Sequence, residues 1–214
     1  MKVLNKFTVQ SSSGVEIDVS VFDQTNYSPM YQAMSEFAST REEGARDQIW
    51  LVQHPQVYTQ GTACSQETFL PSDIPVVKTD RGGQITFHGP GQIVMYPLLR
   101  LKRFGLGVKS LVTNLEQCVV DTLSDYQVDS NRRDDAPGVY VNEAKIAALG
   151  LRIRRGNCYH GLSFNLDMDL SPFSNVDPCG YKGLKVTQLS DLVEQKVDID
   201  KASQQLLSHF LKLI

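Results

Sequence analysis

The sequence has no apolar run long enough to cross a membrane. No stretch approaches the roughly 18 consecutive apolar residues that a spanning helix needs. The first residues, MKVLNKFTVQSSS, also lack the apolar segment of a secretory signal peptide. These absences predict a cytoplasmic protein.

Cysteine is scarce and is not arranged for metal binding. The four cysteines are Cys64, Cys118, Cys158 and Cys179, and no two of them form a CxxC pair. Without an export signal they are expected to be reduced thiols, although four thiols could pair in principle. Cys158 and His160 alone are too few ligands for a metal site. We therefore expect neither a metal nor a cofactor.

The chain also lacks a basic excess. Lys and Arg total 21 against 24 Asp and Glu, which gives a net charge of −3. General nucleic-acid binding usually requires a positive balance, so the composition argues against it. The length of 214 residues and a hydrophobic fraction of 41% suit one catalytic domain over residues 1–214.

Hydrophobic periodicity predicts a mixture of strands and separate helices. Val15, Ile17, Val19 and Val21 alternate, as on one face of a strand. Strands are expected over 14–22, 48–54, 74–79, 92–99, 138–141, 145–153 and 161–168. The short segment 142–144 between two of them predicts the turn of a β-hairpin. Helices are expected over 28–40, with Ser28 as N-cap and Pro29 as first residue, and over 107–125 and 199–213. Consecutive strands are too close for helical crossovers, so we predict an α/β (α+β) sandwich with a mixed β-sheet and flanking helices.

Residues 81–92, RGGQITFHGPGQ, combine four glycines with Arg81 and His88. Glycine lets the backbone come close to a ligand, but the spacing is not that of a standard phosphate-binding loop. Two interpretations remain open from the residues alone. The segment is either a pair of glycine turns flanking a strand or part of a binding site.

Cys179 differs from the other cysteines in its local sequence. Pro178 precedes it and Gly180 follows it, which indicates a sharp, accessible turn. A thiol there can act as a nucleophile, although composition alone leaves this open. Cys118 instead lies on the apolar stripe of a predicted helix, which indicates core packing.

Lys145 begins the otherwise apolar segment KIAALGL. It lies either on an exposed strand start or in a site, and spacing alone favours the former. An ammonium close to Cys179 would lower the cysteine pKa from about 8.5 towards neutral.

Other polar residues near predicted strand ends are less informative. Arg152, Arg154 and Arg155 form either a solvated strand end or a docking patch for an acidic partner. His54 and His160 are single histidines and are expected to be structural.

Four segments together resemble the lipoyl(octanoyl) transferases: 81–99, 135–153, 160–173 and 177–192. The resemblance implies a fold shared with the biotin and lipoate protein ligases. It also implies transfer of an octanoyl or lipoyl group from acyl carrier protein. The acceptor would be the lipoyl-domain lysine of 2-oxoacid dehydrogenases and the glycine cleavage H protein.

By this resemblance Cys179 matches the family's acyl-thioester cysteine and Lys145 its partner lysine. The implied substrate-binding residues are Arg81, Gly82, Gly83, Gln84, Ile85, Thr86, Phe87, His88, Ala148, Leu149, Gly150, Gly161, Leu162 and Ser163. Ile85, Phe87 and Leu149 are expected to contact the acyl chain. Residue 148 is alanine where many relatives have serine, so a hydroxyl has no role there.

Three alternatives accompany this interpretation. An ATP-dependent lipoate or biotin ligase would form an adenylate and need no cysteine nucleophile. A binding module would hold the acyl chain without transferring it. A hydrolase would use Cys179 with His88. If Lys145 and Cys179 meet, Arg152, Arg154 and Arg155 should flank one entrance together with Lys182 and Lys185.

Overall fold

An eight-stranded mixed β-sheet forms the centre of the computed structural model, which describes residues 1–64, 73–176 and 185–214. The strand order is β1-β2-β3-β7-β11-β10-β9-β8, and the β2–β3 pair is parallel while the other pairs are antiparallel. The strands are β1 (Val3–Gln10), β2 (Glu16–Phe22), β3 (Asp47–Val52), β7 (Gln92–Leu98), β8 (Asn131–Arg132), β9 (Val139–Val141), β10 (Ala144–Arg154) and β11 (Asn157–Asn165).

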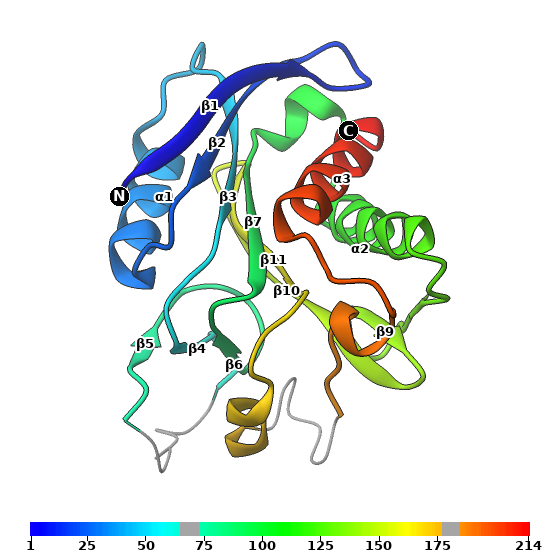
Figure 1. The fold of residues 1–214 in the computed structure, drawn as a ribbon. Coiled ribbons are helices and arrows are strands. Elements are labelled where there is room, and N and C mark those ends of the chain that lie inside the picture. Colours follow the sequence, from blue (N-terminus) through cyan, green and yellow to red (C-terminus); the bar gives the residue numbers. More distant parts are fainter. Residues whose placement is uncertain (65–72, 177–184) are drawn as a thin grey trace.

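A second, three-stranded sheet lies at one end of the large sheet (Figure 1). Its order is β5 (Val76–Lys78), β4 (Val57–Gln60) and β6 (Ile85–His88). The glycine-rich segment 81–92 therefore contains a strand, as one of its two interpretations required.

Helices cover both faces of the large sheet (Figure 1). On one face α1 (Tyr27–Thr40) buries Met30 and Met34 in a cluster with side chains of β3 and β7. On the other face α2 (Val108–Asp125) and α3 (Ile199–Lys212) bury their apolar stripes in the main core. Short 3₁₀ helices are η1 (Leu101–Phe104), η2 (Ser171–Asn175) and η4 (Leu189–Asp191). The predicted mixed-sheet sandwich with flanking helices is confirmed.

The first helix begins earlier than the sequence indicated. Asn26 is the N-cap and Tyr27, which is buried, is the first helical residue, so Ser28 is not the N-cap. Pro29 still lies in the first turn. It is tolerated there because the first N–H groups of a helix have no partner within the helix.

The hairpin predicted around residues 142–144 is present. Asn142 and Glu143 have φ angles of +47° and +67°, which is the left-handed geometry of a tight two-residue hairpin turn. This turn joins β9 to β10 and places Lys145 second in β10. Within the described ranges, no helix is both long and apolar enough to pass through a lipid bilayer.

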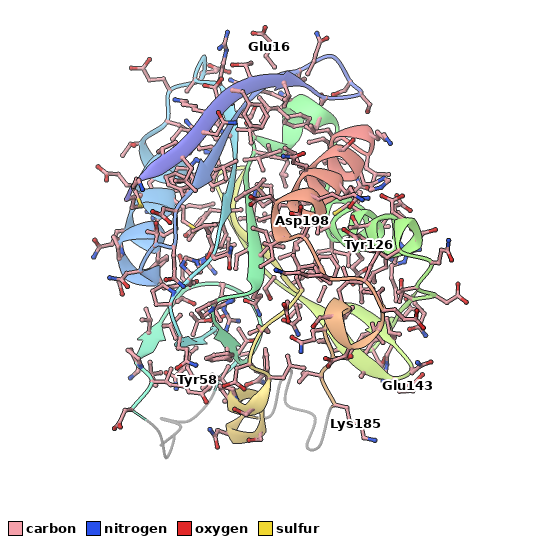
Figure 2. The ribbon with its side chains drawn as sticks, in the orientation of Figure 1. Glu16, Tyr58, Tyr126, Glu143, Lys185 and Asp198 are labelled. Carbon is pink, nitrogen blue, oxygen red and sulfur yellow. The ribbon has the colours of Figure 1, made fainter. Side chains whose placement is uncertain are left out.

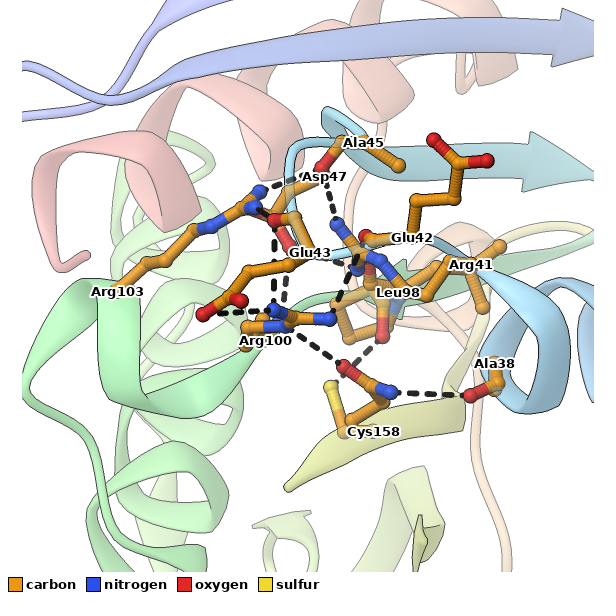
Figure 3. Close-up of polar contacts among 12 residues, drawn as sticks. Ala38, Arg41, Glu42, Glu43, Ala45, Asp47, Leu98, Arg100, Arg103 and Cys158 are labelled. Atoms are coloured by element: carbon orange, nitrogen blue, oxygen red, sulfur yellow. Dashed lines mark hydrogen bonds and ion pairs between the residues drawn. The ribbon is translucent and has the colours of Figure 1, made fainter. Parts of the chain in front are cut away.

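Asp47 anchors the loop after α1 to the sheet (Figure 3). Its side chain is fully buried and forms ion pairs with Arg41 at 2.8 Å and Arg103 at 3.0 Å. The Arg100 backbone N–H also donates to Asp47 Oδ1 at 2.6 Å. One carboxylate thus ties α1, β3 and η1 together.

We expect Asp47→Ala to lower the free energy of unfolding by about 3 to 5 kcal/mol, because it leaves the buried Arg41 guanidinium without its counter-charge. Urea unfolding followed by circular dichroism measures this loss. Glu16→Ala is the matched control, since Glu16 pairs with Arg46 at an exposed site and its loss should cost less than about 1 kcal/mol. Similar losses in both variants would contradict the anchoring role.

Candidate active site

A cavity lies where the two sheets and the start of α1 meet. About 540 Å³ of space lies between the atoms that line it, and part of this space is open to solvent. Its walls come from the segment before β6, from β6 and β7, and from the middle of the β10–β11 hairpin. The lining residues are Tyr27, Arg81, Gly83, Gln84, Ile85, Thr86, His88, Val94, Tyr96, Ala148, Leu149, Gly150, His160, Gly161, Leu162 and Ser163.

This lining contains all the expected substrate-binding residues except Gly82 and Phe87. Gly82 instead joins this segment to β10 by a backbone hydrogen bond, in which the Gly82 N–H donates to the Leu151 carbonyl at 2.9 Å. The Phe87 ring packs against Tyr58 and Phe173 in a separate core cluster. Ile85 and Leu149 are therefore placed to contact a ligand in the cavity, as expected. Phe87 is not, because its ring is buried in the separate cluster.

Four lining residues were not expected from the sequence: Tyr27, Val94, Tyr96 and His160. His160 had been expected to be structural only, yet it forms part of the cavity wall. It also has a φ of +58° inside β11, a backbone geometry that is uncommon for residues other than glycine. Such geometry often occurs at functional sites, but no sequence signal reports it for a histidine.

His54 and His88 are held in neutral, hydrogen-bonded form near the cavity. Burial lowers the pKa of His54 to about 4, and burial together with the nearby His54 lowers the pKa of His88 to about 3. His54 Nδ1 donates to the Thr25 carbonyl at 2.6 Å, so its Nε2 accepts from the Tyr96 hydroxyl at 2.8 Å. His88 Nδ1 lies 2.7 Å from Gln92 Oε1. The ring nitrogens of His54 and Nδ1 of His88 thus already have hydrogen-bond partners in the surrounding protein.

Arg81 is buried beside the cavity and is bonded to backbone and hydroxyl oxygens. Its guanidinium donates to the Thr59 carbonyl at 2.6 Å, to Thr59 Oγ1 at 3.0 Å and to the Gly82 carbonyl at 2.9 Å. A side chain at Gly61 would place its Cβ 2.2 Å from the Gly83 carbonyl and 2.8 Å from Arg81 Nη1. Glycine at position 61 is therefore needed for this close approach.

Lys145 is buried, with 3% of its surface exposed, so the interpretation of an exposed strand start is wrong. Its Nζ donates to the Pro137 carbonyl at 3.0 Å and lies 5.1 Å from the centre of the Tyr140 ring. Lys145 is three residues before Ala148, the first residue of β10 that lines the cavity. The ammonium is thus held on the strand that forms one cavity wall.

The chain after residue 184 returns to Lys145. The Lys145 N–H donates to the Lys185 carbonyl at 2.8 Å, and the Thr187 N–H donates to the Lys145 carbonyl at 3.0 Å. Lys185 lies at the same end of the molecule as Glu143 of the β9–β10 turn (Figure 2). Cys179 and Lys182 lie outside the described residues. In the sequence, Cys179 is six residues before Lys185.

The buried cysteines are poor nucleophiles. Cys118 is fully buried in α2, which confirms its predicted core position, and burial raises its pKa well above the ordinary value. Burial also raises the pKa of Cys158 to about 12, and its thiol donates to the Pro97 carbonyl. Cys118 and Cys158 are both free thiols. Neither buried thiol would form a thiolate near neutral pH.

The arginines at the end of β10 do not share an entrance with Lys185. Arg154 lies nine residues beyond Lys145 on the same strand, which corresponds to about 30 Å. The Lys185 carbonyl accepts from the Lys145 N–H at the opposite end of that strand. The expectation that these arginines and Lys185 flank one opening is therefore wrong for Lys185, because β10 is extended between them, and Lys182 lies outside the described residues. Arg152 is closer to the cavity, with Nε 3.9 Å from Asp80 Oδ2.

The fold is that of the lipoate and biotin protein ligase catalytic domains. A structure of the bipartite lipoate protein ligase and its E2 lipoyl domain from Thermoplasma acidophilum aligns with a TM-score of 0.71 at 16% identity, covering 91% of this chain and 81% of that one. Biotin protein ligase from Aquifex aeolicus, in complex with biotin and ATP, aligns with a TM-score of 0.58 at 12% identity, covering 90% and 68%. The lipoyl protein ligase A/B catalytic domain family matches residues 27–211.

Sequence similarity narrows this class. An octanoyltransferase from Cellvibrio japonicus is 51% identical over 197 residues, covering 92% of each chain. An octanoyltransferase from Pectobacterium atrosepticum is 52% identical over 200 residues, covering 93% of this chain and 88% of that relative. The chain belongs to the octanoyltransferase family within the lipoyl protein ligase A/B group.

Proposed function

We propose that this enzyme transfers an octanoyl or lipoyl group from acyl carrier protein to a lipoyl-domain lysine through a thioester on Cys179. The acceptors would be 2-oxoacid dehydrogenase E2 subunits and the glycine cleavage H protein. The observation that carries the proposal is the pairing of residues 185–187 with Lys145, beside the cavity. Residue 185 follows Cys179 by six residues in the sequence, which supports the proposal that the thiol works beside the buried Lys145 ammonium.

The first half-reaction forms the thioester. The Cys179 thiolate attacks the carbonyl carbon of the donor thioester, and a new C–S bond forms while the bond to the donor's pantetheine sulfur breaks. The Lys145 ammonium stabilises the Cys179 thiolate and returns a proton to the departing sulfur. The acyl group is then held on the enzyme as a covalent intermediate.

The second half-reaction releases the product. A neutral lysine amine of the acceptor attacks the Cys179 thioester, a C–N bond forms and the C–S bond breaks, which regenerates the thiolate. The amine loses a proton in this step, and Lys145, which gave up a proton in the first step, accepts it. Each turnover therefore returns both side chains to their starting states.

The cavity is suited to the acyl chain. Val94, Leu149 and Leu162 line it with apolar surface, and burial keeps the lining residue His88 neutral. Each methylene removed from water contributes about 0.8 kcal/mol, so a cavity of fixed length can discriminate between chain lengths by a few kcal/mol.

Two alternatives are less well supported. A hydrolase that uses His88 as the base for Cys179 needs a histidine that accepts a proton near neutral pH, yet burial holds the pKa of His88 at about 3. An ATP-dependent ligase shares the fold, but relatives that are about half identical are named octanoyltransferases. Adenylate formation from octanoate and ATP would identify a ligase.

The proposal is tested by intact-mass measurement after mixing the protein with octanoyl acyl carrier protein. We expect one added octanoyl group, which hydroxylamine removes and which a lipoyl-domain acceptor discharges. The absence of any adduct, or release of free octanoate without an acceptor, would contradict the transferase mechanism. A stable noncovalent complex without adduct would indicate a binding module.

A further inference from the structure

The backbone that holds the Lys145 ammonium is itself fixed by a buried carboxylate on α2. Glu116 is 7% exposed, and its Oε1 accepts a hydrogen bond from the Gly138 N–H at 2.8 Å. The preceding residue, Pro137, supplies the carbonyl that accepts from Lys145 Nζ at 3.0 Å. Glu116 therefore holds Gly138, and Gly138 is adjacent to Pro137, whose carbonyl accepts the hydrogen bond from Lys145 Nζ.

The Lys145 side chain lies directly against this backbone. A Cβ at Gly138 would lie 2.9 Å from Lys145 Cε and 3.1 Å from Nζ, and the φ of Gly138 is +143°. The Tyr140 hydroxyl donates to the Ala136 carbonyl at 2.7 Å, which holds the same segment from the other side. A shift of residues 136–138 would therefore displace the ammonium.

The position of Glu116 is unusual for a residue that only stabilises the fold. Its neighbours on the buried face of α2 include Leu115 and Val119, and a carboxylate among them is costly to bury unless it is bonded. Burial raises the pKa of Glu116, while the Gly138 N–H and the charges of Arg132 and Lys145 lower it. Asp134 is the other charged group acting on it, and it opposes ionisation.

We propose that Glu116 is a positioning residue for Lys145: by fixing residues 136–138, it holds the ammonium at the site where protons are exchanged with the reacting sulfur and amine. This inference rests on the proposed role of Lys145 in acyl transfer. It assigns to α2, which does not line the acyl cavity, an effect on the chemical step that acts through residues 136–138 and Lys145.

The test compares Glu116→Ala with Glu116→Gln in steady-state octanoyl transfer. Glu116→Ala removes the acceptor of the Gly138 N–H, and we expect kcat to fall about 10- to 100-fold because displacement of a catalytic group by about 1 Å has effects of this size. The KM for the acyl donor should change less than about twofold, since Glu116 does not touch the cavity. Glu116→Gln keeps an oxygen acceptor and should remain within about threefold of the wild-type kcat.

Thr122→Ala is the matched control for loss of stability. Thr122 is fully buried on α2 and its hydroxyl donates to the Cys118 carbonyl, away from residues 136–138. This variant should have a lower melting temperature and an unchanged kcat per folded molecule. If Glu116→Ala does not fold, Glu116→Asp replaces it, because the shorter side chain withdraws the oxygen by one methylene and should reduce kcat without changing KM.

The inference is overturned if Glu116→Ala has the wild-type kcat per folded molecule, or if Glu116→Gln is as defective as Glu116→Ala. These outcomes are separable from failure of the proposed function. A wild-type protein that forms no hydroxylamine-sensitive adduct rejects the thioester mechanism, whatever the variants do. If the wild-type protein forms the adduct and Glu116→Ala is fully active, only the role of Glu116 is rejected.

Discussion

Cys179→Ala is expected to abolish octanoyl transfer to below detection, a loss of at least about 10⁴-fold, because it removes the sulfur that carries the acyl group in the proposed covalent route. The same variant should show no octanoyl adduct by intact mass. Its circular dichroism spectrum and melting temperature should match those of the wild type. Persistence of a hydroxylamine-sensitive adduct would mean that another group carries the acyl chain.

The matched control is Cys118→Ala. Cys118 is fully buried in the main core, so the change removes a packed thiol and should lower the free energy of unfolding by about 1 to 2 kcal/mol. The adduct should still form at the normal stoichiometry. The pair of variants thus separates loss of chemistry from loss of packing.

Lys145→Met should reduce the transfer rate about 100-fold or more, since it removes the group proposed to exchange protons in both half-reactions. Iodoacetamide alkylation of Cys179 should also require a pH about one unit higher or more, because the thiolate loses its ammonium neighbour. Peptide-resolved mass spectrometry across a pH series follows this thiol separately from Cys64. The substitution keeps the approximate length of the side chain.

Lys185→Met provides the comparison for Lys145. Lys185 is exposed and contributes its backbone carbonyl to the pairing with Lys145, so replacing its side chain should leave the alkylation profile unchanged. If the Lys145→Met profile also matches the wild type, Lys145 does not tune the thiol. Its role would then be confined to the second half-reaction or to structure.

Elements with a strong local pattern could be predicted from the sequence. The apolar stripe of α2 predicted residues 107–125, and the helix occupies Val108–Asp125. The hairpin around Asn142 was also predicted correctly. By contrast, β1 was missed. Its first six residues are all exposed, so the strand has no alternation of apolar and polar side chains from which it could be predicted. The start of β11 at Asn157, four residues before the predicted 161, was missed for a related reason, since all its residues are buried.

The site was only partly predictable. Segments that are continuous in the sequence, such as the one around Arg81, could be identified because several lining residues are adjacent. Tyr27 and Tyr96 are far apart in the chain and meet only through the packing of α1 on β7. The burial of Lys145 could not be predicted either, because it depends on the turn at Pro137 and on residues 185–187.

The apolar part of the cavity wall has a consequence for which acyl chains the enzyme accepts. The side chains of Val94, Leu149 and Leu162 line the cavity and carry no hydrogen-bond donor or acceptor. A hydroxyl or keto oxygen on a chain carbon that lies against these side chains would lose its hydrogen bonds to water and find no replacement there. Leaving that oxygen unpaired costs about 1 to 3 kcal/mol, which is roughly a 5- to 150-fold preference for the unsubstituted chain. The wall would thus select reduced chains at those carbons without any residue that recognises the difference.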